Sequence, residues 1–204
     1  MKRLFASLFA LAVALSAVTA LCETKTPREI AGLALGADVK GLEQRLDMSK
    51  AVPLWDKPYL TRANILPTKG YRGGYVLFGN CANPGKIVRI KMKYKDKKPG
   101  LFQKLGKTLT ARYGDPKPLM SDQGGLYLGM AWKFGDHKTG VTALLLEHSA
   151  GDDAESSEGN SIRLTDNALL DQEQTCYEAD RKKEPEPQPA FPLFEIDDDW
   201  LLPK

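Results

Sequence analysis

The sequence is poor in the residues that most often carry catalysis and metal binding. Its 204 residues include two histidines, three cysteines and three tryptophans. No HExxH, CxxC or calcium-loop spacing is present, and there is no GxSxG elbow or Walker loop. The sequence therefore nominates no catalytic, metal-ligating or cofactor-binding residue. With 42% hydrophobic and 27% charged residues, its composition is that of an ordinary globular protein.

The first twenty residues have the pattern of a secretory signal peptide. Two basic residues precede an apolar run over residues 4–17, and residues 18–20 offer a cleavage site after Ala20. The run is short for a membrane-spanning helix, which needs about 20 apolar residues. We therefore predict a periplasmic or secreted protein that begins at Leu21 and has no membrane span once the signal is removed. A membrane anchor is the alternative, and Cys22 leaves a lipidated N-terminus open.

The rest of the chain divides into three parts. Residues 21–29 are predicted to be a flexible N-terminus, and residues 30–183 have the length of a single domain. Residues 184–204 combine a Pro-rich spacer with an acidic and aromatic tail. Because disordered tails rarely contain so many apolar residues, we predict that this tail docks on its own domain or on a partner. The proposed anchors are Phe194, Ile196 and Trp200.

Alternating apolar residues and helical repeats predict an α+β fold. One helix is expected to be capped by Asp38, and a second is expected to follow the break at Pro99-Gly100 and to end at Tyr113. A third is expected to start near Thr165 or Asp166 and to run to about Lys183. We predict an antiparallel sheet of about six strands with helices on one face, in the order α-βββ-α-βββ-α. Two three-stranded layers are the alternative. The expected strands are Tyr59–Leu66, Gly74–Gly79, Lys86–Tyr94, Leu126–Phe134, Val141–His148 and Asn160–Leu164.

Charge is unevenly distributed along the chain. Residues 86–118 carry eleven Lys or Arg against two Asp, whereas residues 147–199 carry sixteen acidic residues against four basic ones. In the strand Lys86–Tyr94, basic residues alternate with apolar ones, which predicts one solvated, basic face. Such a face suits an acidic ligand, and nucleic acid is not expected as a partner of an exported protein. Its residues are Arg89, Lys91 and Lys93.

The three cysteines predict one disulfide bond and one unpaired cysteine. Cys81 precedes the basic strand, and Cys176 lies on the apolar side of the last expected helix. Because export leads to an oxidising compartment, we predict that these two are joined. Two separately buried thiols are the alternative. Cys22 would then remain near the mature N-terminus.

A second hypothesis is an envelope hydrolase built around a histidine. Glu147 and His148 end an expected strand and precede the acidic loop that holds Asp152 and Asp153. These residue types supply acid and base groups, but their spacing matches no known catalytic or metal motif. The other histidine, His137, lies in an expected turn.

Two resemblances bear on the class of protein. The combination of Gly32–Gly36, a following short helix, Gly79–Tyr94 and the Leu109-x-x-x-Tyr-Gly-Asp-Pro motif resembles a group of small exported bacterial proteins of unknown function. The resemblance covers about residues 30–180. A smaller part is similar to small envelope domains of the outer-membrane assembly lipoprotein kind. Neither resemblance implies catalytic residues. The sequence favours a non-catalytic periplasmic binding or interaction module whose partner is an envelope protein or an acidic ligand.

Overall fold

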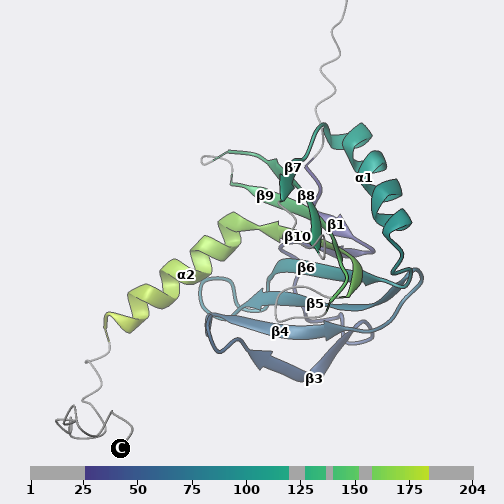
Figure 1. Ribbon diagram of the computed structural model, residues 1–204. Helices are drawn as coiled ribbons and strands as arrows, with labels where there is room; N and C mark the ends of the chain where they lie inside the picture. The colour runs from purple at the N-terminus through teal and green to yellow at the C-terminus, as the bar shows by residue number, and fades with distance from the viewer. Residues whose placement is uncertain (1–25, 120–126, 137–139, 152–157, 184–204) are drawn as a thin grey trace, which may run out of the picture.

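The computed structural model describes residues 26–119, 127–136, 140–151 and 158–183. This part of the chain forms two sheets and two helices. Two short strands come first, followed by four long strands and a helix. Four further strands and a second helix complete the described chain (Figure 1).

Eight strands form one sheet, in the order β3-β4-β5-β6-β10-β9-β8-β7, and every neighbouring pair is antiparallel. Consecutive strands of each half pair with one another, and the two halves meet where β6 pairs with β10. The first half comprises β3 (Leu46–Pro53), β4 (Leu60–Ile65), β5 (Tyr71–Gly79) and β6 (Ile87–Tyr94). The second half comprises β7 (Lys117–Leu119), β8 (Tyr127–Phe134), β9 (Thr142–Ser149) and β10 (Gly159–Asp166).

One face of this sheet, called here the first face, carries the main hydrophobic core. Alternate residues of the strands point to this face and lie opposite one another across the sheet, as Ile162 does with both Met92 and Leu146. Helix α1 (Pro99–Tyr113) packs on it through the side chains that recur every three or four residues. The helix begins with proline and ends at Gly114, whose positive φ of 81° suits a residue without Cβ.

The opposite face, called here the second face, has a smaller apolar cluster at one end. Leu77 and Val88 point to this side, because the register of β5 and β6 shifts between Leu77 and Phe78 and leaves Val88 as an extra residue. Helix α2 (Asn167–Arg181) packs against them through Leu169 and Tyr177, among others. The two helices therefore cover opposite faces of the sheet.

The expected helix from Asp38 to Leu46 is absent, and this segment forms turns instead. The Asp38 carboxylate accepts a hydrogen bond from the backbone N–H of Lys40 at 2.9 Å, which closes a turn. Gly41 has a positive φ of 85°, and the backbone of Val39 is hydrogen-bonded to Gly85 rather than along a helix. The preceding hairpin of β1 (Glu29–Ile30) and β2 (Leu33–Ala34) packs with this segment against the first face of the main sheet.

The predicted α+β fold with about six strands and helices on one face is wrong, and the two described helices lie on opposite faces. The described chain is mostly β, with an eight-stranded sheet and a separate two-stranded sheet. It has two helices rather than three, so the order α-βββ-α-βββ-α does not hold. The extra strands β3 and β7 were missed because they lie at the edges of the sheet, where burial enforces little alternation.

Candidate functional site

Basic side chains gather on the second face of the sheet. Across strands β4, β5, β6, β10 and β9, this face carries one carboxylate, Glu147. Tyr75 of β5 lies opposite Lys91, and Arg163 of β10 lies opposite Lys91 from the other side. The face therefore has a surplus of positive charge in the described structure. Its cations are Arg62, Arg89, Lys91, Lys93 and Arg163.

Lys91 and Glu147 form a buried ion pair at the centre of this face. Their side chains are 1% and 6% exposed, and the Lys91 Nζ lies 3.2 Å from Glu147 Oε2. The same carboxylate accepts hydrogen bonds from the hydroxyls of Tyr127 at 2.9 Å and Ser161 at 3.2 Å. With these partners Glu147 compensates Lys91, and removal of either member would leave a buried charge, at a cost of about 3–5 kcal/mol.

Arg89 and Arg163 are less well compensated. The Arg89 Nε donates a hydrogen bond to the hydroxyl of Thr165 at 3.0 Å, and no described carboxylate forms an ion pair with Arg89. Burial lowers the pKa of Arg89, and the neighbouring positive charge of Arg163 lowers it further, whereas the Tyr75 hydroxyl and the Glu147 carboxylate act in the opposite direction. Arg163 reaches Glu147 only at 3.9 Å. Arg89 and Arg163 are diagonal neighbours on β6 and β10, and they share the influence of Glu147, whose carboxylate also pairs with Lys91.

The structure places the predicted binding residues Arg89, Lys91 and Lys93 on the same face, but it does not leave that face uniformly solvated. Lys91 is sealed within the protein, whereas Arg89 and Lys93 are half-buried. The prediction of a solvated strand face is thus wrong for Lys91. Sequence reasoning missed Arg163, which joins the site because β10 pairs with β6.

Arg62 and Tyr75 extend the basic surface toward β4. The Arg62 guanidinium lies over the Tyr75 ring, 4.5 Å from its centre, as in a cation–π contact. Tyr75 is also the diagonal neighbour of Arg89 across β5 and β6, on the same face of the sheet. The sequence offered no signal for this arrangement beyond the strand pattern of Gly74–Gly79.

Of the residues of the hydrolase hypothesis, the structure describes Glu147 and His148, and these two point to opposite faces of the sheet. His148 points to the first face, where its Nδ1 lies 2.9 Å from Asn160 Oδ1 and its ring packs against Phe102. The Asn160 amide donates to two backbone carbonyls, so its oxygen accepts the proton of His148. Glu147 points to the second face. Asp152, Asp153 and His137 lie outside the described residues.

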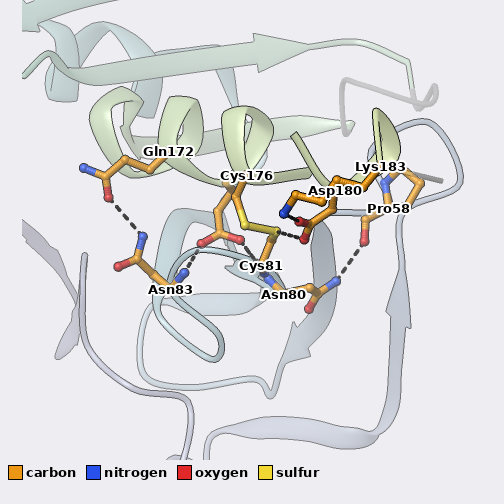
Figure 2. The surroundings of a disulfide bond; sticks show 9 residues. Pro58, Asn80, Cys81, Asn83, Gln172, Cys176, Asp180 and Lys183 are labelled. Atoms are coloured by element: carbon orange, nitrogen blue, oxygen red, sulfur yellow. Dashed lines mark hydrogen bonds and ion pairs between the residues drawn. A yellow bond between two sulfur atoms is a disulfide. The ribbon is translucent and has the colours of Figure 1, made fainter. Parts of the chain in front are cut away.

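Helix α2 is fixed to the connection between β5 and β6 by the predicted disulfide. Cys81 and Cys176 are joined with an S–S distance of 2.02 Å (Figure 2). Three residues before Cys176, on the same side of the helix, Glu173 has a fully buried carboxylate. This carboxylate accepts hydrogen bonds from the backbone N–H groups of Asn80 at 3.0 Å, Cys81 at 2.7 Å and Asn83.

The connection between β5 and β6 folds around the Glu173 carboxylate. A Cβ at position 79 would overlap the Glu173 carboxylate, so Gly79 allows the helix to approach. The side chain of Asn80 accepts a hydrogen bond from Thr61 and donates one to the backbone of Pro58, which extends the contact to β4. The sequence could have suggested Glu173, because it precedes Cys176 by about one helical turn.

Only one group of described residues has the composition of a metal site. It consists of Cys81, Cys176 and Asp180, whose ligand atoms all lie within 4.8 Å of one another. Both sulfur atoms are used in the disulfide, so this group offers no thiolate while the bond is intact. The Asp180 carboxylate is paired with Lys183 at 2.9 Å.

Comparisons with known protein families, with curated proteins and with solved structures found no match to this chain. None of the helices in the described residues is both long and apolar enough to cross a membrane. The predicted docking tail with Phe194, Ile196 and Trp200, the predicted signal peptide and Cys22 lie outside the described residues.

Proposed function

We propose that the protein is a non-catalytic binding module that recognises a carboxylate-rich polypeptide on the second face of its sheet. The observation that carries this proposal is the neighbouring pair of Arg89 and Arg163. Each guanidinium offers a planar set of donors that matches a carboxylate. Arg89 forms no ion pair with a described carboxylate, and Arg163 reaches Glu147 only at 3.9 Å.

The positive charges of Arg89 and Arg163 repel one another, and burial of Arg89 adds a desolvation cost. Both effects lower the pKa of Arg89, which means that the folded protein holds this charge at an energetic disadvantage. An external carboxylate between Arg89 and Arg163 would remove the repulsion and supply hydrogen-bond acceptors. The buried Lys91–Glu147 pair behind them would hold the two strands in place without competing for the ligand.

The proposed compartment is the periplasm or the exterior of the cell. The disulfide between Cys81 and Cys176 supports an oxidising compartment, where such bonds persist. The signal-like residues at the N-terminus support the same assignment. A partner in that compartment would be an acidic segment of an envelope or secreted protein rather than a nucleic acid.

The test is a titration of the full chain with a fluorescent poly-glutamate peptide. The test variant carries Arg89→Gln and Arg163→Gln, and the control variant carries Lys104→Gln and Lys107→Gln, two exposed positions on α1. We expect the arginine variant to bind at least tenfold more weakly. The reason is that hydrogen bonds to charged groups contribute about 1.5–3 kcal/mol each, and about 1.4 kcal/mol corresponds to tenfold in affinity.

A further variant with Arg89→Lys and Arg163→Lys separates charge from geometry. It keeps both charges and loses the planar donor arrangement, so its affinity should fall between those of the wild type and the glutamine variant. Circular dichroism and thermal unfolding of every variant establish that the fold is retained. Equal weakening in the α1 control, or unchanged binding in the glutamine variant, would refute a specific site at the two arginines.

A further inference from the structure

Helix α2 begins beside the site proposed above and carries the chain away from it over a known length. Arg89 is hydrogen-bonded to Thr165, which lies two residues before the first residue of α2. The helix has 15 residues, so at about 1.5 Å per residue it ends about 22 Å from its start. The disulfide and Glu173 hold α2 on the second-face side of the sheet, which fixes where the following chain departs.

The chain beyond α2 is long enough to return to the site. Residues 184–196 include a Pro-rich spacer, and at about 3.1 Å per residue this length spans about 40 Å. This reach exceeds the length of α2 by nearly a factor of two. The segment that follows is Asp197–Asp199, next to Trp200.

The charges of this tail complement those of the second face. Residues 184–204 contain six acidic side chains and one lysine. On the second face Arg89 has no ion pair with a described carboxylate, and Arg163 reaches Glu147 only at 3.9 Å. The Arg62–Tyr75 pair lies next to Arg89 on the same face. In the tail, carboxylates are followed by the Trp200 ring. On the second face, the two arginines are followed by the flat Arg62–Tyr75 pair, so the groups of the tail complement those of the face in the same order.

We propose that the chain's own C-terminal tail is the first ligand of the second face. Asp197–Asp199 bind at Arg89 and Arg163, and Trp200 packs on the Arg62–Tyr75 pair. This inference rests on the proposed function, since it names the segment that occupies the same site. The tail then acts as a tethered competitor that a partner must displace.

Tethering sets the size of the expected effect. A linker of this length gives an effective concentration on the order of 1 mM. If the tail binds with an intrinsic dissociation constant of roughly 0.1 mM, it weakens the apparent affinity for an outside peptide about tenfold. Neutralising the tail with Asp197→Asn, Asp198→Asn and Asp199→Asn should therefore strengthen poly-glutamate binding about tenfold.

The experiment uses the full chain labelled with 5-fluorotryptophan. Its three fluorine resonances are assigned with Trp200→Phe and Trp55→Phe, which leaves the buried Trp132 unchanged. We expect the Trp200 resonance of the wild type to move on neutralisation of the tail, and to move to the same position in the variant with Arg89→Gln and Arg163→Gln. The control with Lys104→Gln and Lys107→Gln should leave it in place.

The outcomes separate this inference from the proposed function. If the Trp200 resonance is the same in all variants, and the tail variant binds poly-glutamate as the wild type does, the tail does not dock and the proposed function stands. If no variant binds the peptide and the resonance never moves, both fail. A Trp200 resonance that changes on dilution would show docking between two copies, and would overturn docking within one chain.

Discussion

Glu173 should contribute more to stability than any other single carboxylate on α2, because three backbone N–H groups depend on it. In Glu173→Gln, one carboxylate oxygen is replaced by an NH₂ group, which is a donor. At least one of the N–H groups of Asn80, Cys81 and Asn83 would then face another donor. The charge that strengthens the remaining bonds is lost as well.

The cost can be worked from these contacts. A hydrogen bond to a charged group contributes about 1.5–3 kcal/mol, and an unpaired buried donor costs about 1–3 kcal/mol. One lost bond and weakened neighbours give about 2–4 kcal/mol for Glu173→Gln. The matched control is Gln172→Ala, one residue away and exposed, which loses one side-chain hydrogen bond to Asn83 and should cost less than about 1 kcal/mol.

Urea unfolding with the disulfide intact measures this cost. The cross-link constrains the unfolded chain equally in both proteins, so its contribution cancels in the difference. With a urea dependence of about 2 kcal/mol per molar, a loss of 3 kcal/mol lowers the midpoint by roughly 1.5 M. Amide hydrogen exchange at Asn80, Cys81 and Asn83 should accelerate in the same variant. A midpoint equal to that of Gln172→Ala, with unchanged exchange at these amides, would refute the assigned role of Glu173.

Two further predictions concern the cross-link and alkaline pH. Replacing Cys81 and Cys176 by serine should lower the free energy of unfolding by roughly 4–5 kcal/mol, the value that the chain-entropy model gives for a sequence separation of 95. Urea midpoints measure this loss, and an unchanged midpoint would contradict the prediction. Burial, and then the neighbouring Tyr71, raise the pKa of Tyr94 above its ordinary 10.0. The unfolded phenol ionises first, so the stabilisation is complete below about pH 10 and is lost as the pH rises further. Tyr94→Phe should reduce this loss between about pH 9 and 11, and equal pH profiles of the two proteins would argue against it.

The sequence predicted the central strands and both observed helices because their local signals agree with the fold. Strand β6 alternates apolar and basic residues, and its expected range Lys86–Tyr94 differs from the observed Ile87–Tyr94 by one residue. Helix α2 begins after Asp166, whose side chain accepts a hydrogen bond from the backbone of Leu169. In each case the residue pattern and the tertiary burial favour the same element.

The helix expected at Asp38 was predicted wrongly because the apolar spacing of this segment fits both a helix and a series of turns. Val39, Leu42 and Leu46 have helical spacing, but the segment is short, and Gly36 and Gly41 both have positive φ. Turns bury Val39 and Leu46 equally well, because the backbone of Val39 is hydrogen-bonded to the β5–β6 connection. Periodicity over eight residues does not distinguish these arrangements, and the tertiary contact decides between them.

The sequence predicted only the β6 residues of the candidate site. The alternation in β6 places Arg89, Lys91 and Lys93 on one face, but it does not say whether that face is wet. The answer depends on β9 and β10, which lie 50 or more residues later in the chain and supply Glu147 and Arg163. No local spacing links these positions, so the buried pair and the arginine pair emerge only from the strand order.

The contrast between Lys91 and Arg89 is the strongest argument for a binding role of this face. If the second face served stability alone, an apolar side chain at position 89 could pack beside Leu77 and Val88, where apolar side chains of α2 already pack. Such a side chain would carry no desolvation cost. Lys91 forms an ion pair with a buried carboxylate, whereas Arg89 forms none with a described carboxylate and is stabilised only through the Thr165 and Tyr75 hydroxyls and the field of Glu147. A guanidinium held at an electrostatic disadvantage next to another is better explained by an anion that arrives from outside the sheet, and the glutamine and lysine variants of the two arginines test that explanation.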